Sequence, residues 1–566
     1  MSATSTDAMP RRFVPADLQA DDREAIAALY QQLEARPLPD RAALEAWIAD
    51  WEELNAITDE LYNETYVAMT CDTKDEAREA RYMRVLEEFL PLHERSNFAL
   101  QRKLLDAPAL GELDASYSVF LRQARTRVEL FREENVPLQT EAQKLEQEYE
   151  KIIGGEMVEF QGERRTMQQM SVFLEENDRA LREEAWRARD VVRAADEAAL
   201  DDLFDRMLVV RRQIAANAGC KDYREYTFAN LLRFDYTPED CLAFHDAIEH
   251  HVVPVVHEFN ERRGRLMGVD TLRPWDLRVD PEGQPPLRPF STVDELITRC
   301  RRVFEQVDPE LGAFYNTMIE RDLLDLGSRE GKAPGGYMTS FRVKRVPFIF
   351  MNAVGLKRDV DTLLHEGGHA FHYFLARELP LQTYHHTGSE FSEVASQTME
   401  YLSRPYLQDF YAAEDLDRLH ADQLREALAF LPFMAMLDAF QHWVYTTPDT
   451  DAAARRAKWA DLEARFRPDT DWTGLEGARD AGWQYPHVFG APFYYVEYGI
   501  SLLAALRIWL NSLEDERAAV TAYKQALALG GSRPLPELFA AAGAKFGMDD
   551  AIVREIVQDT VAHIPA

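Results

Sequence analysis

Cysteine and glycine are both scarce in this chain of 566 residues, and each shortage restricts the fold. The four cysteines are widely scattered and form no C-x-x-C pair: Cys71, Cys220, Cys241 and Cys300. A chain this long builds a large core without disulfide bonds, so we expect reduced thiols in a cytoplasmic protein. Only 26 glycines occur, whereas Ala, Glu, Leu and Arg abound, and this combination predicts helices.

Long apolar runs and an excess of positive charge are also missing. No stretch approaches 18 uninterrupted apolar residues, so we expect no transmembrane helix. The first residues lack the apolar segment of a secretory signal. A net charge of −34 repels nucleic acid and anionic membranes, so we expect neither as a partner. The acidic surface either attracts cationic peptides or is only solvated, and we favour the second interpretation.

Most of the chain shows apolar residues at the three- and four-residue spacing that predicts helices. The pattern covers residues 21–103 and 114–153, and it resumes from about residue 415 to the end. The strongest strand signal lies between these regions, in Tyr337–Val343 and Val346–Asn352, with a smaller hairpin expected in residues 157–167. The sequence therefore predicts a mainly α fold with one small β-sheet directly before residues 365–372.

That segment, residues 365–372, reads H-E-G-G-H-A-F-H and contains the H-E-x-x-H pattern. On a helix, His365 and His369 lie about one turn, roughly 6 Å, apart, so both imidazoles can converge on one metal ion. Glu366 lies to one side, where its carboxylate can hold a water molecule beside the metal. Asp359 is the expected N-cap of this helix. The pattern indicates a metal-dependent hydrolase, most of all a peptidase.

Two glycines within the motif, Gly367 and Gly368, weaken the helix by about 1 kcal/mol each relative to alanine. We favour the interpretation that they permit the close approach of a neighbouring element or of substrate over one of local packing alone.

A catalytic zinc ion needs a third protein ligand, and the following helical segment offers three acids. Spacing alone leaves Glu390, Glu393 and Glu400 as candidates, and each could equally be a surface carboxylate. Glu393 and Glu400 are seven residues apart and share a helix face. One of them could bind the metal while the other supports a ligand histidine from behind.

The motif, followed by F-S-E-V-A-S-Q-T-M-E at 391–400, resembles the thimet oligopeptidase and oligoendopeptidase F family of zinc peptidases. The resemblance extends more loosely over about 200–560. It implies one Zn²⁺ per chain, held by His365, His369 and Glu393. It also implies that Glu400 is the carboxylate that supports the metal site.

A C-terminal segment, residues 487–498, carries a histidine followed by closely spaced tyrosines. Phenol hydroxyls and a nearby histidine can donate hydrogen bonds to a developing oxyanion, although an aromatic core stripe would look the same. The resemblance implies that His487, Tyr495 and Tyr498 have the catalytic role, with Tyr494 a close competitor. Because this loop has few glycines, the chain is more similar to the bacterial oligoendopeptidase F branch.

Residues Gly335, Gly336 and Tyr337 open the predicted sheet and match a substrate-binding segment of that family. An extended peptide could pair with an exposed strand edge here, and glycine would permit its close approach. A purely structural hairpin is the alternative.

The family resemblance implies a helical ellipsoid split by a deep substrate channel. We expect an N-terminal helical domain, 1–195, to form one channel wall and a catalytic zinc metallopeptidase domain to occupy 196–566. The expected activity is a cytoplasmic zinc-dependent endopeptidase that hydrolyses short unstructured oligopeptides by Glu366-assisted attack of zinc-bound water.

Two other functions stay open at this point. The first is a zinc-dependent peptidyl-dipeptidase or carboxypeptidase, which would need a cation for the substrate carboxylate, with Arg342, Lys344 and Arg345 as candidates. The second is a helical binding protein with an inactive motif, which the intact ligand set argues against. The sequence leaves the oligomeric state open.

Overall fold

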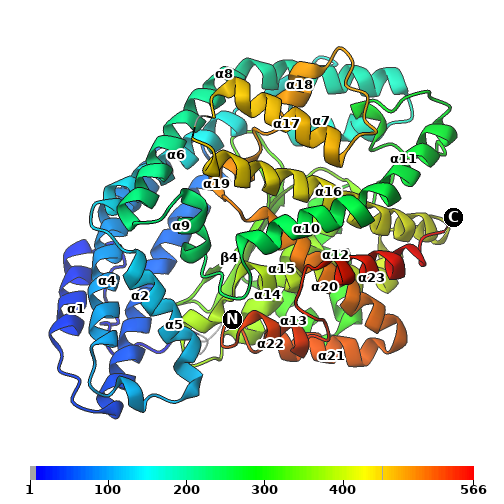
Figure 1. Ribbon diagram of the computed structural model, residues 1–566. Coiled ribbons are helices and arrows are strands. Elements are labelled where there is room, and N and C mark those ends of the chain that lie inside the picture. Colours follow the sequence, from blue (N-terminus) through cyan, green and yellow to red (C-terminus); the bar gives the residue numbers. More distant parts are fainter. Residues whose placement is uncertain (1–7, 449, 566) are drawn as a thin grey trace.

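The computed structural model describes residues 8–448 and 450–565 and is 69% helical, which confirms the mainly α prediction. Six helices come first: α1 (Arg23–Ala35), α2 (Arg41–Cys71), α3 (Glu76–Arg84), α4 (Leu90–Leu105), α5 (Ser118–Leu130) and α6 (Asn135–Gly154). In Figure 1, α1, α2, α4 and α5 gather at one end of the molecule, and α6 leads away from them along its outer edge.

The central part begins with a hairpin and then returns to helices. The hairpin consists of β1 (Met157–Phe160) and β2 (Glu163–Thr166), paired antiparallel as expected. The helices that follow are α7 (Met167–Met170), α8 (Arg179–Ala218), α9 (Tyr223–Asn230), α10 (Pro238–His251), α11 (Val253–Met267), α12 (Val293–Val307) and α13 (Pro309–Glu320). Asp178 is the N-cap of the 40-residue α8, and its side chain accepts from Ala180 N. Gly219, with φ +80°, follows the last residue of the helix as its C-cap.

The remaining helices surround a small sheet. They are α14 (Lys357–Ala376), α15 (Ser389–Leu402), α16 (Ala413–Thr446), α17 (Ala452–Phe466), α18 (Glu476–Asp480), α19 (Pro486–Gly490), α20 (Tyr495–Glu514), α21 (Glu516–Leu527), α22 (Leu535–Ala541) and α23 (Asp550–Val561). Helix α16 is long and apolar enough to cross a membrane, but 72% of its most apolar window is buried inside the protein. It is therefore a core helix of this fold.

Three strands form the sheet in the order β3–β5–β4: β3 (Leu324–Gly327), β4 (Tyr337–Phe341) and β5 (Val346–Ala353). Strand β5 is parallel to β3 and antiparallel to β4, with Met338 opposite Ile349. Because β5 lies in the middle, it is apolar and buried along nearly its whole length. Strands β3 and β4 are the two edge strands, and β5 leads directly into α14.

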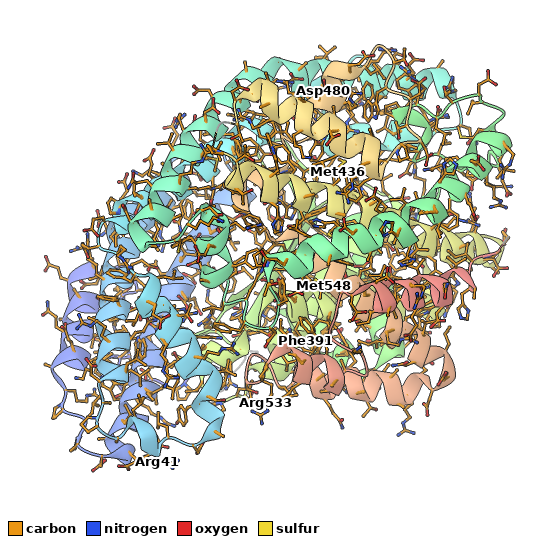
Figure 2. The ribbon with its side chains drawn as sticks, viewed as in Figure 1. Arg41, Phe391, Met436, Asp480, Arg533 and Met548 are labelled. Atoms are coloured by element: carbon orange, nitrogen blue, oxygen red, sulfur yellow. The ribbon has the colours of Figure 1, made fainter. Side chains whose placement is uncertain are left out.

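The largest hydrophobic core contains α14, α15, α16 and α20, so the helices with the predicted site residues lie inside the molecule. Figure 2 shows Phe391 of α15 near the centre, with Arg41 and Asp480 at opposite ends. A second core joins the N-terminal helices α1, α2, α4 and α5 to Leu381 and Tyr384 of the segment between α14 and α15. The N-terminal helices thus share apolar contacts with the part of the chain that carries the motif.

Candidate metal and catalytic site

Helix α14 presents the H-E-x-x-H motif, and its start differs from our prediction. The helix begins at Lys357, so Asp359 lies inside the first turn and is not the N-cap. Its Oδ2 instead accepts hydrogen bonds from the backbone N–H groups of Val354, Gly355 and Leu356, at 2.7, 2.9 and 2.9 Å. One carboxylate thus satisfies three donors of the strand-to-helix turn, which fixes where α14 leaves the sheet.

The two glycines of the motif permit close contact with neighbouring helices, as expected. A Cβ atom on Gly367 would lie 2.5 Å from Cζ of Phe304 in α12. A Cβ atom on Gly368 would lie 2.5 Å from the carbonyl oxygen of Ala395 and 2.6 Å from Cα of Ser396. Only glycine therefore allows the α14 backbone to touch α15, the helix that carries Glu393.

Three predicted metal ligands converge between these helices. His365 Nε2 lies 3.2 Å and His369 Nε2 lies 3.5 Å from Oε2 of Glu393. Ligand atoms of the three residues all lie within 4.8 Å of one another. Tetrahedral zinc with bonds of about 2.0–2.2 Å holds its donor atoms about 3.3 Å apart. The donor set and its spacing therefore fit a zinc ion.

Glu393 is ionised and held from several sides. Its side chain is 2% exposed, and burial opposes ionisation, but His369 and His365 keep the pKa of this carboxyl well below its usual range. Ser396 Oγ donates to Oε2 at 2.8 Å, and the Tyr494 hydroxyl donates to Oε1 at 2.5 Å. One oxygen thus faces the histidines while the other is anchored by a tyrosine.

The three acids that spacing left open have different partners. Glu393 meets both histidines, whereas Glu400 Oε1 lies 2.7 Å from His365 Nδ1. Glu390 instead accepts from the Tyr236 hydroxyl at 2.6 Å. Burial works against protonation of His365, but its hydrogen bonds to Glu393 and Glu400 raise its pKa well above the usual value. Glu400 thereby orients the ring so that Nε2 faces the ligand cluster.

Glu366 is buried beside the two histidines, and its Oε2 has no hydrogen-bond partner among the described residues. Burial raises the pKa of this carboxyl, while the nearby His365 and His369 partly oppose the increase. The backbone N–H of Met338 in β4 also stabilises the carboxylate. The edge strand β4 therefore lies next to the predicted general base.

A cavity of about 350 Å³ brings His365 together with three residues from the C-terminal segment, His487, Tyr495 and Tyr498. The His487 ring centroid lies 4.8 Å from that of Tyr495 and 5.8 Å from that of Tyr498. Burial lowers the pKa of His487 to about 4 and raises the pKa of both tyrosines. At neutral pH this group therefore consists of an uncharged imidazole and two protonated phenols.

The backbone turn that delivers these tyrosines depends on residues that sequence reasoning missed. Phe493, directly before Tyr494, has φ +65°, a conformation that L side chains rarely adopt. Its N–H donates to Oε1 of Gln441 at 2.6 Å, and its carbonyl accepts from Nη2 of Arg233 at 2.5 Å. No local sequence signal marks these contacts, because Gln441 and Arg233 lie far from Phe493 in the chain.

The segment at the start of β4 is positioned by its backbone. Gly335 has φ +91°, and its carbonyl accepts from Nδ2 of Asn352 at 2.9 Å. Gly336 packs near Thr362 of α14. The Tyr337 ring stacks on Phe350, and its hydroxyl lies 2.6 Å from Oγ1 of Thr70 in α2. The side chain of Tyr337 is thus engaged elsewhere, and the carbonyl of Ser340 further along β4 accepts from Nδ2 of Asn63 in α2 at 3.0 Å.

The fold is helical, and it brings an H-E-x-x-H motif on one helix against a glutamate on the next. This is the arrangement of a metallopeptidase site. The sequence matches the profile of peptidase family M3 over residues 172–558 and that of the peptidase M3 N-terminal domain over residues 13–131. The chain therefore belongs to peptidase family M3, and its relatives place it in the oligoendopeptidase F branch.

Those relatives include proteins of known structure. PZ peptidase A, crystallised with an inhibitor, is 28% identical, with a TM-score of 0.93 over 98% of this chain and 99% of that one. An oligoendopeptidase F is 30% identical, with a TM-score of 0.92 over the same shares. The oligoendopeptidase F homolog of Borreliella burgdorferi is 24% identical over 301 residues, 50% of this chain and 49% of that protein. The match thus spans about half the length of this curated relative.

Proposed function

We propose that this protein is a cytoplasmic zinc-dependent endopeptidase that cleaves short unstructured oligopeptides. The observation that carries the proposal is the convergence of His365 and His369 on one oxygen of Glu393, next to the buried Glu366. Membership of peptidase family M3 and the peptidases among its relatives support it.

His365, His369 and Glu393 would hold the zinc ion, with the fourth position left for water or substrate. When bound, zinc supplies Lewis-acid chemistry: it polarises a carbonyl group and lowers the pKa of water. Glu400 keeps the His365 ring in the orientation that presents Nε2. Tyr494 holds the second oxygen of Glu393 at 2.5 Å, which keeps the other oxygen free to act as a ligand.

Glu366 is the general base of this mechanism. Its unpartnered Oε2 can accept the proton of the attacking water, and its raised pKa favours holding that proton until it passes to the leaving amine. Tyr495 and Tyr498 keep their protons and can donate hydrogen bonds to the oxygen of the attacked carbonyl. The neutral His487 can donate in the same way or bind the substrate backbone.

The substrate would extend along the edge strand β4, with backbone hydrogen bonds that do not depend on side-chain identity. A second cavity, of about 790 Å³, extends from the N-terminal helices to the start of α15 and includes Glu52, Arg127 and Gly388. Residues of both 1–195 and 196–566 line this cavity, which supports a channel wall formed by the first range beside a catalytic domain formed by the second.

The test is Glu366→Gln, assayed with internally quenched peptides. Loss of the general base should lower turnover by about 10²–10⁴-fold, while the metal content stays that of the wild type. The control is Glu414→Gln, an exposed acid at the start of α16, which should leave turnover unchanged. Wild-type turnover by the metal-loaded Glu366→Gln variant would refute the mechanism.

An exopeptidase that acts on peptide C-termini is the second candidate, and the cations first considered for it are already paired. Arg342 contacts Asp59 at 2.8 Å, Lys344 contacts Glu64 at 2.5 Å, and Arg345 contacts Glu378 at 2.5 Å, so none is available without breaking an ion pair.

Three other arginines are better suited to bind the C-terminal carboxylate of a substrate, as an exopeptidase requires. Arg189 of α8, Arg278 and Arg358 of α14 have no ion-pair partner within the part of the chain that the structure describes. Desolvation in this crowded part of the molecule and the neighbouring arginines lower the pKa of Arg278, which is exposed, and lower that of Arg189 to about 9. Glu175 and Glu156 partly oppose these shifts. Unpaired cations are unexpected in a protein of net charge −34, and a substrate carboxylate would relieve their repulsion.

The comparison that separates the two candidates uses one peptide with a free or an amidated C-terminus. An exopeptidase should lose at least about tenfold in kcat/KM on amidation, which corresponds to about 1.4 kcal/mol, and Arg358→Gln should abolish the difference. Equal rates for both peptides, with internal cleavage seen by mass spectrometry, would exclude the exopeptidase and support the endopeptidase.

A further inference from the structure

Four side chains between α10 and α16 form a buried cluster that the peptidase mechanism does not use. Cys241 and His245 lie one turn apart on α10, and Asp438 and His442 lie one turn apart on α16. Both pairs have the four-residue spacing of His365 and His369. All four residues are at most 4% exposed, and thiolate, imidazole and carboxylate are the ligand types that zinc prefers.

The distances within this cluster are those of a metal site. Ligand atoms of Cys241, Asp438 and His442 all lie within 4.8 Å of one another, as they do for the three ligands in the peptidase site. His442 Nε2 is 3.2 Å and His245 Nε2 is 2.8 Å from Oδ2 of Asp438. Two facing helices thus supply three donors around one point, while His245 is a hydrogen-bond partner of Asp438.

One oxygen of the cluster lacks a partner. Asp438 Oδ1 is buried and has no hydrogen bond within the described part of the chain, whereas His442 Nε2 faces the other oxygen of Asp438 at 3.2 Å. Buried polar atoms are nearly always paired, so an unpaired carboxylate oxygen in the core indicates a missing ligand. A divalent cation would balance one thiolate and one carboxylate, leaving no net charge in the core.

Arg224 also contacts the cluster, with its Nη1 3.3 Å from Nδ1 of His442, and Arg233 and Glu390 are charged groups near Cys241. If Nε2 binds a metal, Nδ1 carries a proton, and the guanidinium of the half-buried Arg224 must turn away. The metal-free alternative is a hydrogen-bonded network in which Arg224 donates to Nδ1 and Asp438 accepts from both histidines. The experiment below distinguishes these two states.

We propose that Cys241, Asp438 and His442 form a second, structural binding site for a zinc-class divalent ion, which ties α10 to α16, and that His245 orients Asp438 from behind. Binding would release the thiol proton of Cys241 to solvent. The site lies next to the turn that precedes the tyrosines of the peptidase site. The centroid of the His442 ring lies 5.2 Å from that of Phe493, and the neighbouring Gln441 accepts a hydrogen bond from the backbone N–H of Phe493. The second ion would thus steady the turn before Tyr494.

Cobalt substitution gives this site a signature of its own, because the peptidase site contains no cysteine. The full-length protein is stripped with a chelator, loaded with Co²⁺ and dialysed, and its metal content and near-ultraviolet spectrum are recorded. We expect two Co²⁺ per chain and a thiolate-to-cobalt charge-transfer band. His365→Ala should lose one ion but keep the band, and Cys241→Ser should lose the other ion together with the band.

Controls separate metal loss from misfolding. Cys300→Ser replaces an equally buried cysteine outside the cluster and should keep both ions and the band. Asp438→Asn preserves the side-chain shape and should still lower the metal content to one ion per chain. A wild-type protein that binds one Co²⁺ without the band overturns the proposal, as does a band that survives in folded Cys241→Ser. Neither result would bear on the peptidase site, which His365→Ala reports separately.

Discussion

At the scale of single residues, the two oxygens of the Glu393 carboxylate have different partners. Oε2 faces both histidines, while Oε1 accepts the Tyr494 hydroxyl. A carboxylate free on both sides could bind a metal through one oxygen or through both. Because Tyr494 holds Oε1, the side chain presents a single oxygen to the histidines, and a metal bound there would keep a position open for water. Tyr494 is therefore a positioning residue.

Glu400 is the residue on which the orientation of His365 depends. Replacing it with glutamine keeps the size of the side chain but removes the charge that faces Nδ1 at 2.7 Å. We expect Glu400→Gln to weaken zinc binding by about 10–100-fold, as for other partners of ligand histidines. Competition with a chromogenic chelator measures the affinity directly.

The control for this prediction is Glu537→Gln, an exposed acid in α22 that should leave zinc affinity unchanged. An unchanged affinity for Glu400→Gln would mean that the ring of His365 is held by packing alone.

Single-residue chemistry was only partly predictable from the sequence. The four-residue spacing of His365 and His369 is a local property, and a helix converts it directly into geometry. The choice among three acids on the next helix depends on how two helices cross, which spacing does not encode. The family resemblance, not the periodicity, selected Glu393. The anchoring by Tyr494 was missed because it joins residues about a hundred positions apart.

At the scale of elements, the site depends on the distance between α14 and α15. Gly368 lies where the two backbones touch, so the gap between the helices is set by the absence of a side chain. Ligand atoms on both helices must meet at one point, and a shift of the helix pair would separate them.

The prediction at this scale is Gly368→Ala. The new methyl group would lie 2.5 Å from the Ala395 carbonyl oxygen, and backbone cannot move aside as a flexible side chain does. Overpacking of this kind costs about 1–3 kcal/mol, more than the roughly 1 kcal/mol that alanine adds to helix stability. We expect a lower Tm together with weaker zinc binding, measured by thermal unfolding and chelator competition.

Gly477→Ala in α18 is the matched control, because no atom lies within 4 Å of its added Cβ. It should be neutral or slightly stabilising. If Gly368→Ala bound zinc with wild-type affinity, close contact of the two helices would not be needed for the ligand geometry.

Helices and strands were predicted well where a local sequence pattern specifies them. They were predicted poorly where a contact with a distant residue sets the boundary or the backbone conformation. Strands β4 and β5 lie close to the expected residues because β-branched and aromatic residues are concentrated there. Asp359 was wrongly expected to be the N-cap, since the turn from β5 into α14 lets its side chain cap three N–H groups from inside the helix. The left-handed Phe493 has no signature, because the favourable contacts that hold it come from α16 and from Arg233.

At the scale of the whole molecule, the N-terminal helices are fastened to the sheet that borders the site. Nδ2 of Asn63 in α2 donates to the carbonyl of Ser340 in β4 at 3.0 Å, and the carboxylate of Glu60 accepts from the backbone N–H of Lys344 at 3.1 Å. These contacts join α2 to the end of β4 and to the turn that follows it. The N-terminal helices and the catalytic helices together therefore enclose the ligands.

This enclosure predicts which substrates can reach the site. The side chains of His365 and Glu393 are only 19% and 2% exposed, so a substrate must enter the molecule to meet them. An extended chain needs only the spacing of one added strand, about 4.8 Å from β4, whereas a small folded domain is about 30 Å across. We expect a peptide of suitable sequence to be cleaved, and the same sequence inside a disulfide-closed domain to resist cleavage. Reduction and unfolding of that domain should restore cleavage at the same bond, which mass spectrometry of the products would identify. Equal cleavage of the folded and unfolded forms would show that the enclosing helices open widely during turnover, and selection for unstructured peptides would then require another cause.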